Sequence, residues 1–174
     1  MMDSFKVNLT PFNRERTIRV YLPTNYDSSH QRYPVLYMHD GQYLFRDEDT
    51  KLGGSWRIED YLNKSEYEVI IVGIDCADGL LRIEEYGPWE NHFIRERIDG
   101  VKGTVGGKGE LYVDYIVNEL KPIIDDKYRT IKEDAAMAGS SMGGLITFLR
   151  HANTRIFLKK LHVCLLHFGL TKKN

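Results

Sequence analysis

The sequence has few of the features that would place it outside the ordinary globular proteins. Two cysteines, Cys76 and Cys164, are too few for a disulfide framework and favour a reducing compartment. No apolar run approaches the length of a membrane span, and Met1–Lys6 lacks the apolar core of a secretory signal. The net charge of -1 gives no reason to expect nucleic acid or an anionic membrane as a partner. We therefore expect a cytoplasmic protein that binds neither.

Acidic residues are missing from the last part of the chain. All 25 Asp and Glu residues lie at or before Asp134, whereas residues 150–174 contain six Lys or Arg and no acid. One interpretation is a basic tail that binds a polyanion. The other is that this segment was not selected together with the rest of the chain.

Apolar patterns indicate strands that alternate with helices. Thr17–Leu22 alternates as a half-exposed antiparallel strand does, and continuously apolar Pro34–Met38 and Val69–Ile74 suit buried strands of a parallel sheet. Helices are predicted over Trp56–Leu62 and over Gly109–Tyr128, the latter kinked or split at Pro122. Ala77–Gly109 is predicted to be mostly loop. The order predicts an α/β domain with a doubly wound, mainly parallel sheet.

The segment Gly139–Gly143 matches the pattern G-x-S-x-G. A short strand over Ala135–Ala138 is predicted before it and an apolar helix after it, as in a nucleophile elbow. Ser141 would then attack an ester carbonyl, and the backbone N–H of Met142 would stabilise the oxyanion. The bare pattern also occurs by chance in loops, and its strand-then-helix context is what favours the elbow.

Three other groups of polar residues have simpler alternatives. His39–Gln42 follows a predicted strand, where a backbone N–H near Gly41 and Gln42 could complete an oxyanion hole, but Asp and Gly also favour plain tight turns. The adjacent carboxylates Glu84 and Glu85 are expected to be solvated. The six histidines show no zinc-type spacing, so no metal site is predicted.

Seven segments in order resemble the esterase family of α/β-hydrolases that includes esterase D and the enterochelin-esterase-like proteins. The resemblance covers about residues 15–147, through Arg19–Pro23, Tyr33–Gln42, Gly54–Trp56, Val72–Asp75, Arg82–Trp89, Glu119–Ile124 and Ala138–Leu145. It implies an α/β-hydrolase-type sheet with Ser141 as nucleophile and the N–H groups of Met142 and Gln42 as the oxyanion hole. It also implies small carboxylic esters as substrates and no cofactor.

The chain departs from the family's pattern after the elbow. The triad of this fold runs Ser, then Asp or Glu, then His, but no acid follows Ser141. His151, His162 and His167 do follow it, too soon to have crossed back over the sheet. We therefore expect residues 1–149 to be the N-terminal portion of an α/β-hydrolase domain whose sheet is incomplete and ends at the nucleophile strand. Residues 150–174 would be a basic tail that is non-native or read out of frame.

Two functions follow from these residues. The first is a serine esterase by lineage, working through an acyl-enzyme on Ser141, with this chain an inactive fragment that lacks the triad acid and base. The alternative is a non-catalytic binding protein that retains the hydrolase pocket.

Overall fold

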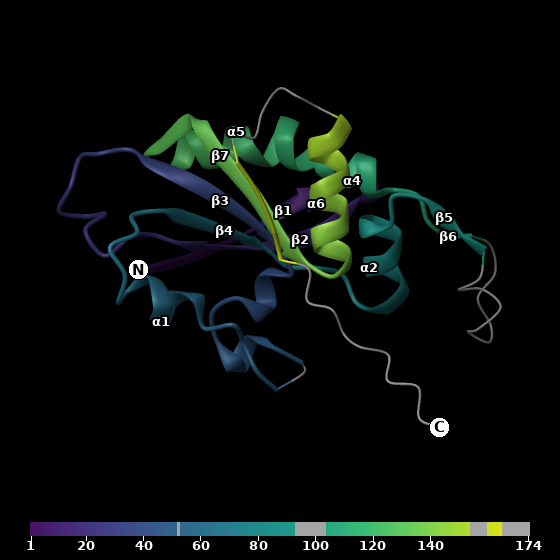
Figure 1. Cartoon of the computed structure of the whole chain (residues 1–174), viewed down its shortest axis with the longest axis horizontal. Coiled ribbons are helices and arrows are strands. Elements are labelled where there is room, and N and C mark those ends of the chain that lie inside the picture. Colours follow the sequence, from purple (N-terminus) through teal and green to yellow (C-terminus); the bar gives the residue numbers. More distant parts are fainter. Residues whose placement is uncertain (52, 93–103, 154–159, 165–174) are drawn as a thin grey trace.

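A six-stranded sheet in the order β1-β2-β4-β3-β7-β8 forms the centre of the molecule (Figure 1). The computed structural model describes residues 1–51, 53–92, 104–153 and 160–164, with side chains described up to residue 148. The strands of this sheet are β1 (Met2–Leu9), β2 (Arg14–Tyr21), β3 (Tyr33–His39), β4 (Ile70–Ile74), β7 (Thr130–Ser140) and β8 (Lys160–Cys164). A separate short pair joins β5 (Glu90–Asn91) to β6 (Val105–Gly106).

The directions of the strands agree with the sequence patterns. The continuously apolar strand β4 is buried at all its residues and pairs in parallel with β3, which also pairs in parallel with β7. The alternating strand β2 pairs antiparallel with both β1 and β4. The predicted α/β fold with a mainly parallel sheet is thus confirmed.

Side chains of β4 divide the core between the two faces of the sheet. Ile70, Val72 and Ile74 belong to the larger apolar cluster, whereas Ile71 belongs to a smaller one on the other face. The α-helices among the described residues are α1 (Ile58–Leu62), α2 (Gly79–Tyr86), α4 (Gly109–Tyr115), α5 (Lys121–Lys127) and α6 (Met142–Asn153). Helices α4, α5 and α6 lie on one side of the sheet and α1 lies on the other (Figure 1).

Pro122 divides the long amphipathic helix, as predicted. The π-helical segment η4 (Ile116–Leu120) separates α4 from α5, and Pro122 stands in the first turn of α5. Proline lacks the N–H that an i→i−4 bond would need, so the bonding pattern widens locally. Leu120 and Ile124 remain buried on both sides of the change.

The prediction that Ala77–Gly109 is mostly loop was wrong over α2. This helix buries Glu85 beside Tyr86, and the Glu85 carboxylate lies 2.7 Å from Arg16 Nη2. The expectation that Glu84 and Glu85 are both solvated is therefore wrong for Glu85. The sequence pattern gave no signal because the buried face of α2 carries a charge.

The sheet continues past the nucleophile strand, contrary to expectation. β8 pairs in parallel with β7, from Ala136 opposite Lys160 to Ser140 opposite Cys164. Helix α6 runs from Met142 to Asn153, so it continues into the basic segment; the domain boundary at residue 149 stays a prediction. Part of the basic segment therefore has regular backbone structure. The hypothesis that this segment is read out of frame stays a prediction.

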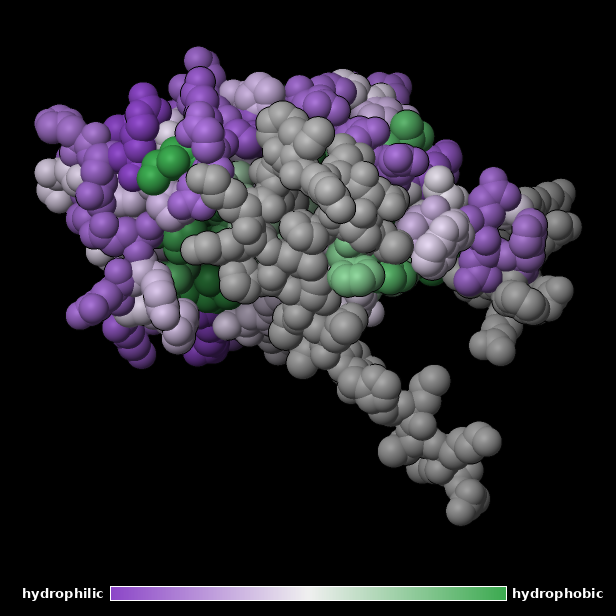
Figure 2. Space-filling model, turned by 45° about the horizontal axis from the view of Figure 1, so that its top comes forward, coloured by the Kyte–Doolittle hydropathy of each residue, from purple (hydrophilic) through white to green (hydrophobic). Residues whose placement is uncertain are grey.

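On the face shown in Figure 2 the visible described residues are mostly hydrophilic, with apolar residues exposed at several places. Phe148 on α6 and Leu111 on α4 are each 50% exposed. No helix among the described residues is both long and apolar enough to cross a membrane.

Candidate active site

Ser141 occupies a sharp turn between a strand and a helix. β7 ends at Ser140 and α6 begins at Met142, so a single residue makes the turn. Its φ of 54° lies in the left-handed region, which costs a residue with a side chain about 1–2 kcal/mol. The side chain is exposed. A strained serine held outward on such a turn is the geometry that an attacking hydroxyl requires.

The glycines of the motif allow β7 and α6 to approach closely. A Cβ atom on Gly139 would lie 2.5 Å from the carbonyl carbon of Gly143 and 2.7 Å from Cδ2 of His39. A Cβ atom on Gly143 would lie 3.0 Å from Cβ of His39. Gly139 therefore requires a residue without a side chain, and at Gly143 a Cβ atom would fit only if His39 moved by a few tenths of an ångström.

The loop after β3 lies at the same edge of the sheet as Ser141. Met38 of β3 is opposite Ala138 of β7 in parallel register, so the residues that follow each strand emerge side by side. Gln42 lies in the 3-10 helix η2 (Gly41–Tyr43), and Met142 is the first residue of α6. N–H groups in the first turn of a helix have no acceptor within that helix. The backbone thus brings the three predicted site residues to one edge of the sheet.

His39 is fully buried and packs against the two glycines of the turn, Gly139 and Gly143. Its Nδ1 lies 3.2 Å from the hydroxyl of Tyr112, and its Nε2 lies 2.9 Å from that of Thr147. The Thr147 hydroxyl in turn donates to the carbonyl oxygen of Gly143 at 2.8 Å. Burial lowers the pKa of His39 to about 4. The negative charge of Asp40 raises this pKa and the positive charge of Arg82 lowers it, but burial has the largest effect. His39 is thus a neutral structural group at pH 7, with both ring nitrogens engaged.

The partners of the Asp40–Gln42 loop were not predicted from the sequence. Arg82 forms a two-bond ion pair with Asp40, and the side chain of Gln42 bonds to Cys76. Asp40 could be predicted as a turn residue, but its partner could not, because α2 was expected to be loop. The side chains of His151, His162 and His167 lie outside the described part of the chain.

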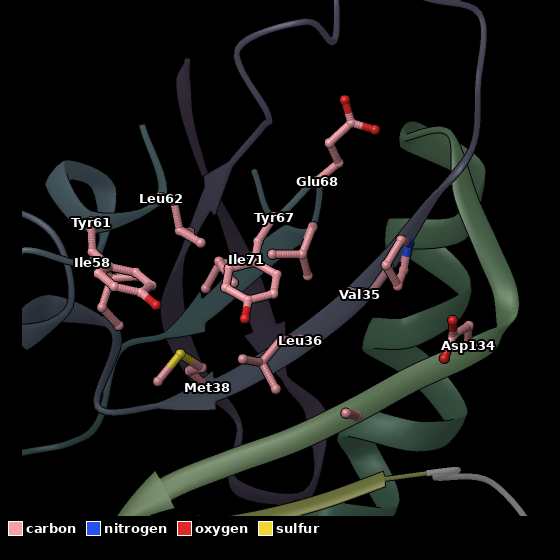
Figure 3. A pocket seen from close by; sticks show the side chains of 13 residues that line it. Val35, Leu36, Met38, Ile58, Tyr61, Leu62, Tyr67, Glu68, Ile71 and Asp134 are labelled. Carbon is pink, nitrogen blue, oxygen red and sulfur yellow. The ribbon is translucent and has the colours of Figure 1, made fainter. Parts of the chain in front are cut away.

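An apolar cavity of about 460 Å³ lies between α1 and the sheet (Figure 3). Leu62 of α1 and Leu36 and Met38 of β3 line it, with Tyr61 and Tyr67 also on its wall. Neither Ser141 nor Gln42 contributes to the lining. The cavity is therefore separate from the nucleophile turn.

In the described residues no group of three or more His, Cys, Asp or Glu side chains could hold a metal ion.

An elbow serine at the carboxyl edge of a doubly wound, mainly parallel sheet defines an α/β-hydrolase-type fold. The chain belongs to the family described as "Putative esterase", whose model matches residues 10–154.

Two curated relatives are Bacillus subtilis proteins named as uncharacterized. YbbA is 28% identical over 134 residues, which are 76% of this chain and 49% of the relative. YjcH is 31% identical over 141 residues, which are 79% of this chain and 50% of the relative. The chain therefore spans about half the length of the curated relatives that it matches.

Solved structures share the fold. The crystal structure of an IroE-like serine hydrolase from Shewanella oneidensis superposes with a TM-score of 0.71 at 24% identity. The match covers 92% of this chain and 49% of that one. The similarity supports the α/β-hydrolase-type architecture deduced from the strand order.

Proposed function

We propose that the chain carries the nucleophile and oxyanion hole of a serine esterase that acts on small carboxylic esters. The observation that carries this proposal is the left-handed φ of the exposed Ser141, at a strand-to-helix turn in a chain of an esterase family. A strained backbone at a non-glycine residue is retained where function needs it. The IroE-like neighbour, named as a serine hydrolase, supports the same mechanism.

The reaction is acyl transfer through Ser141. The Oγ atom forms a bond to the ester carbonyl carbon, the carbonyl π electrons move to oxygen, and the hydroxyl proton leaves to a base. The N–H groups of Met142 and Gln42 donate to the resulting oxyanion. Collapse of the intermediate breaks the bond to the alcohol, which leaves with a proton, and water then hydrolyses the acyl-enzyme.

The described residues supply no oriented base for that proton. His39 is buried between Tyr112 and Thr147, and no Asp or Glu follows Ser141 in the sequence. A serine without a positioned base is a weak nucleophile. We therefore propose that the 174-residue chain alone turns over esters slowly, by nucleophile and oxyanion hole only.

Hydrolysis of p-nitrophenyl acetate by the purified chain tests this function, with Ser141→Ala as the matched control. We expect slow release of p-nitrophenol that the substitution abolishes. Mass spectrometry should find the acetyl group, or a fluorophosphonate label, on Ser141. Equal release by both proteins, without a label on Ser141, contradicts the esterase. Saturable ester binding without hydrolysis would instead favour the non-catalytic binding protein.

A further inference from the structure

Asp40 has a left-handed backbone conformation two residues before Gln42, the predicted oxyanion-hole residue. Its φ of 60° and ψ of 45° lie in the left-handed region, and it directly precedes η2, which contains Gln42. Aspartate enters that region more readily than other non-glycine residues, and contacts of its side chain and N–H help to keep it there. The contacts that hold Asp40 therefore determine where the N–H of Gln42 points.

Two side chains of α2 make those contacts. Arg82 Nε and Nη2 donate to the two carboxylate oxygens of Asp40 at 2.7 and 2.9 Å, and Asp40 N–H donates to the hydroxyl of Tyr86 at 3.2 Å. Residues four apart on a helix share a face, so Arg82 and Tyr86 act on Asp40 together. The Asp40 and Arg82 side chains are 8% and 25% exposed, which shields the pair from solvent.

Helix α2 is itself attached to the sheet. Glu85 accepts hydrogen bonds from Arg16 at 2.7 Å and from Arg14 at 3.1 Å, both on β2. These bonds hold α2 in place against the sheet, and α2 in turn holds Arg82 beside Asp40.

A second element holds the loop at Gln42. The backbone N–H of Cys76, which follows β4, donates to Gln42 Oε1 at 2.9 Å, and Gln42 Nε2 lies 2.9 Å from Cys76 Sγ. Burial, with the nearby charge of Asp40, raises the pKa of Cys76 to about 12, so the sulfur stays a neutral thiol. The loop is fixed from α2 on one side and from the β4 end on the other.

We propose that Arg82 is a positioning residue that, through Asp40, holds the Gln42 N–H in place for the oxyanion. This inference rests on the proposed function, because it needs Ser141 as the nucleophile. Arg82 acts through the loop and touches no reacting atom.

The rate of fluorophosphonate labelling at Ser141 measures this role in the 174-residue chain. In that reaction the bond between Ser141 Oγ and phosphorus forms, the P–F bond breaks, fluoride leaves and the hydroxyl proton passes to hydroxide. The phosphoryl oxygen occupies the oxyanion hole. Arg82→Met should slow labelling on the order of 10-fold to 100-fold, since loss of one oxyanion donor costs at least that much. Arg82→Lys should recover part of the rate, because lysine keeps the charge without the two-bond geometry.

A matched control is Lys121→Met, which removes another shielded ion pair. The side chains of Lys121 and Asp125 are 15% and 10% exposed and lie on α5. Helix α5 precedes the first residue of β7, whereas Ser141 follows its last residue. The labelling rate of this control should equal that of the unchanged chain. The double variant Arg82→Met with Asp40→Asn should label no more slowly than the slower single variant, because the two residues act as one unit.

Each outcome separates this inference from the proposed function. If the unchanged chain is not labelled at Ser141, the proposed function fails. If it is labelled, and Arg82→Met has the same circular dichroism and the same rate, the positioning role alone is overturned. Should Arg82→Met not fold, Arg82→Lys decides: a slower rate supports the role and an equal rate overturns it.

Discussion

At the scale of single residues, Gly139 sets how closely β7 can approach α6. We expect Gly139→Ala to lower the free energy of unfolding by about 1–3 kcal/mol, because its Cβ atom would meet backbone that cannot move freely. Urea denaturation measures the change. Gly54→Ala is the control, since a Cβ atom there meets nothing within 4 Å. Equal stability of the Gly139 variant and the unchanged chain would show that the turn relaxes without cost.

His39 makes stability depend on pH. Its pKa of about 4 in the folded state lies below the ordinary value of 6.5, so the unfolded chain binds the proton first as pH falls. The contribution of His39 is complete above pH 6.5 and is lost progressively between pH 6.5 and 4, by about 3 kcal/mol in total. Urea denaturation at several pH values should show this slope.

A pair of histidine variants isolates the effect from that of the carboxylates. His39→Gln should flatten the slope between pH 6.5 and 4, whereas His30→Gln, on an exposed residue, should keep it. If both variants keep the full slope, burial of His39 does not control its protonation.

At the scale of elements, α2 depends on a buried charge. Glu85→Ala would leave Arg16, only 7% exposed, without its closest partner, and breaking a buried pair costs about 3–5 kcal/mol. Chemical denaturation should show this loss. Glu15→Ala, which breaks the Lys6–Glu15 pair at 64% exposure on each side, should cost less than about 1 kcal/mol. Similar losses in the two variants would contradict the proposed anchoring of α2.

Elements with a clear apolar period could be predicted, and those held by charges could not. The strands β2, β3 and β4, and the break at Pro122, follow from alternation, continuous apolar runs and proline chemistry. Strand β1 and helix α2 were missed. β1 is an edge strand with many polar residues, and α2 buries a glutamate where an apolar side chain would have given the signal.

At the scale of the whole molecule, the site could be predicted only in part. G-x-S-x-G and the His39–Gln42 segment indicated two turns at one edge of the sheet, because parallel strands bring their carboxyl ends to one edge. The roles of Ser141, Met142 and Gln42 stay predictions. The contacts that hold those residues join segments far apart in the sequence, such as Arg82 with Asp40 and His39 with Thr147. A single sequence carries no pattern for such pairs.

The uneven charge of the chain gives a prediction about its gene. We propose that residues 150–174 are read out of frame, because this segment holds six basic residues and no acid. DNA sequencing past the codon for residue 149 should reveal, in another frame, a continuation with an Asp or Glu and a later His. Only stop codons in the other two frames would falsify this.

The pairing of β3 with β7 affects how the chain is made. β3 is complete at His39, but the strand that pairs with its second edge begins only at Thr130. Ribosomes add about 5–20 residues per second, so roughly 5–20 s pass before β7 emerges. During that interval the backbone N–H and C=O groups on this edge of β3 are unpaired and open to other nascent chains. Synthesis of this protein should therefore depend on chaperones that bind such edges early.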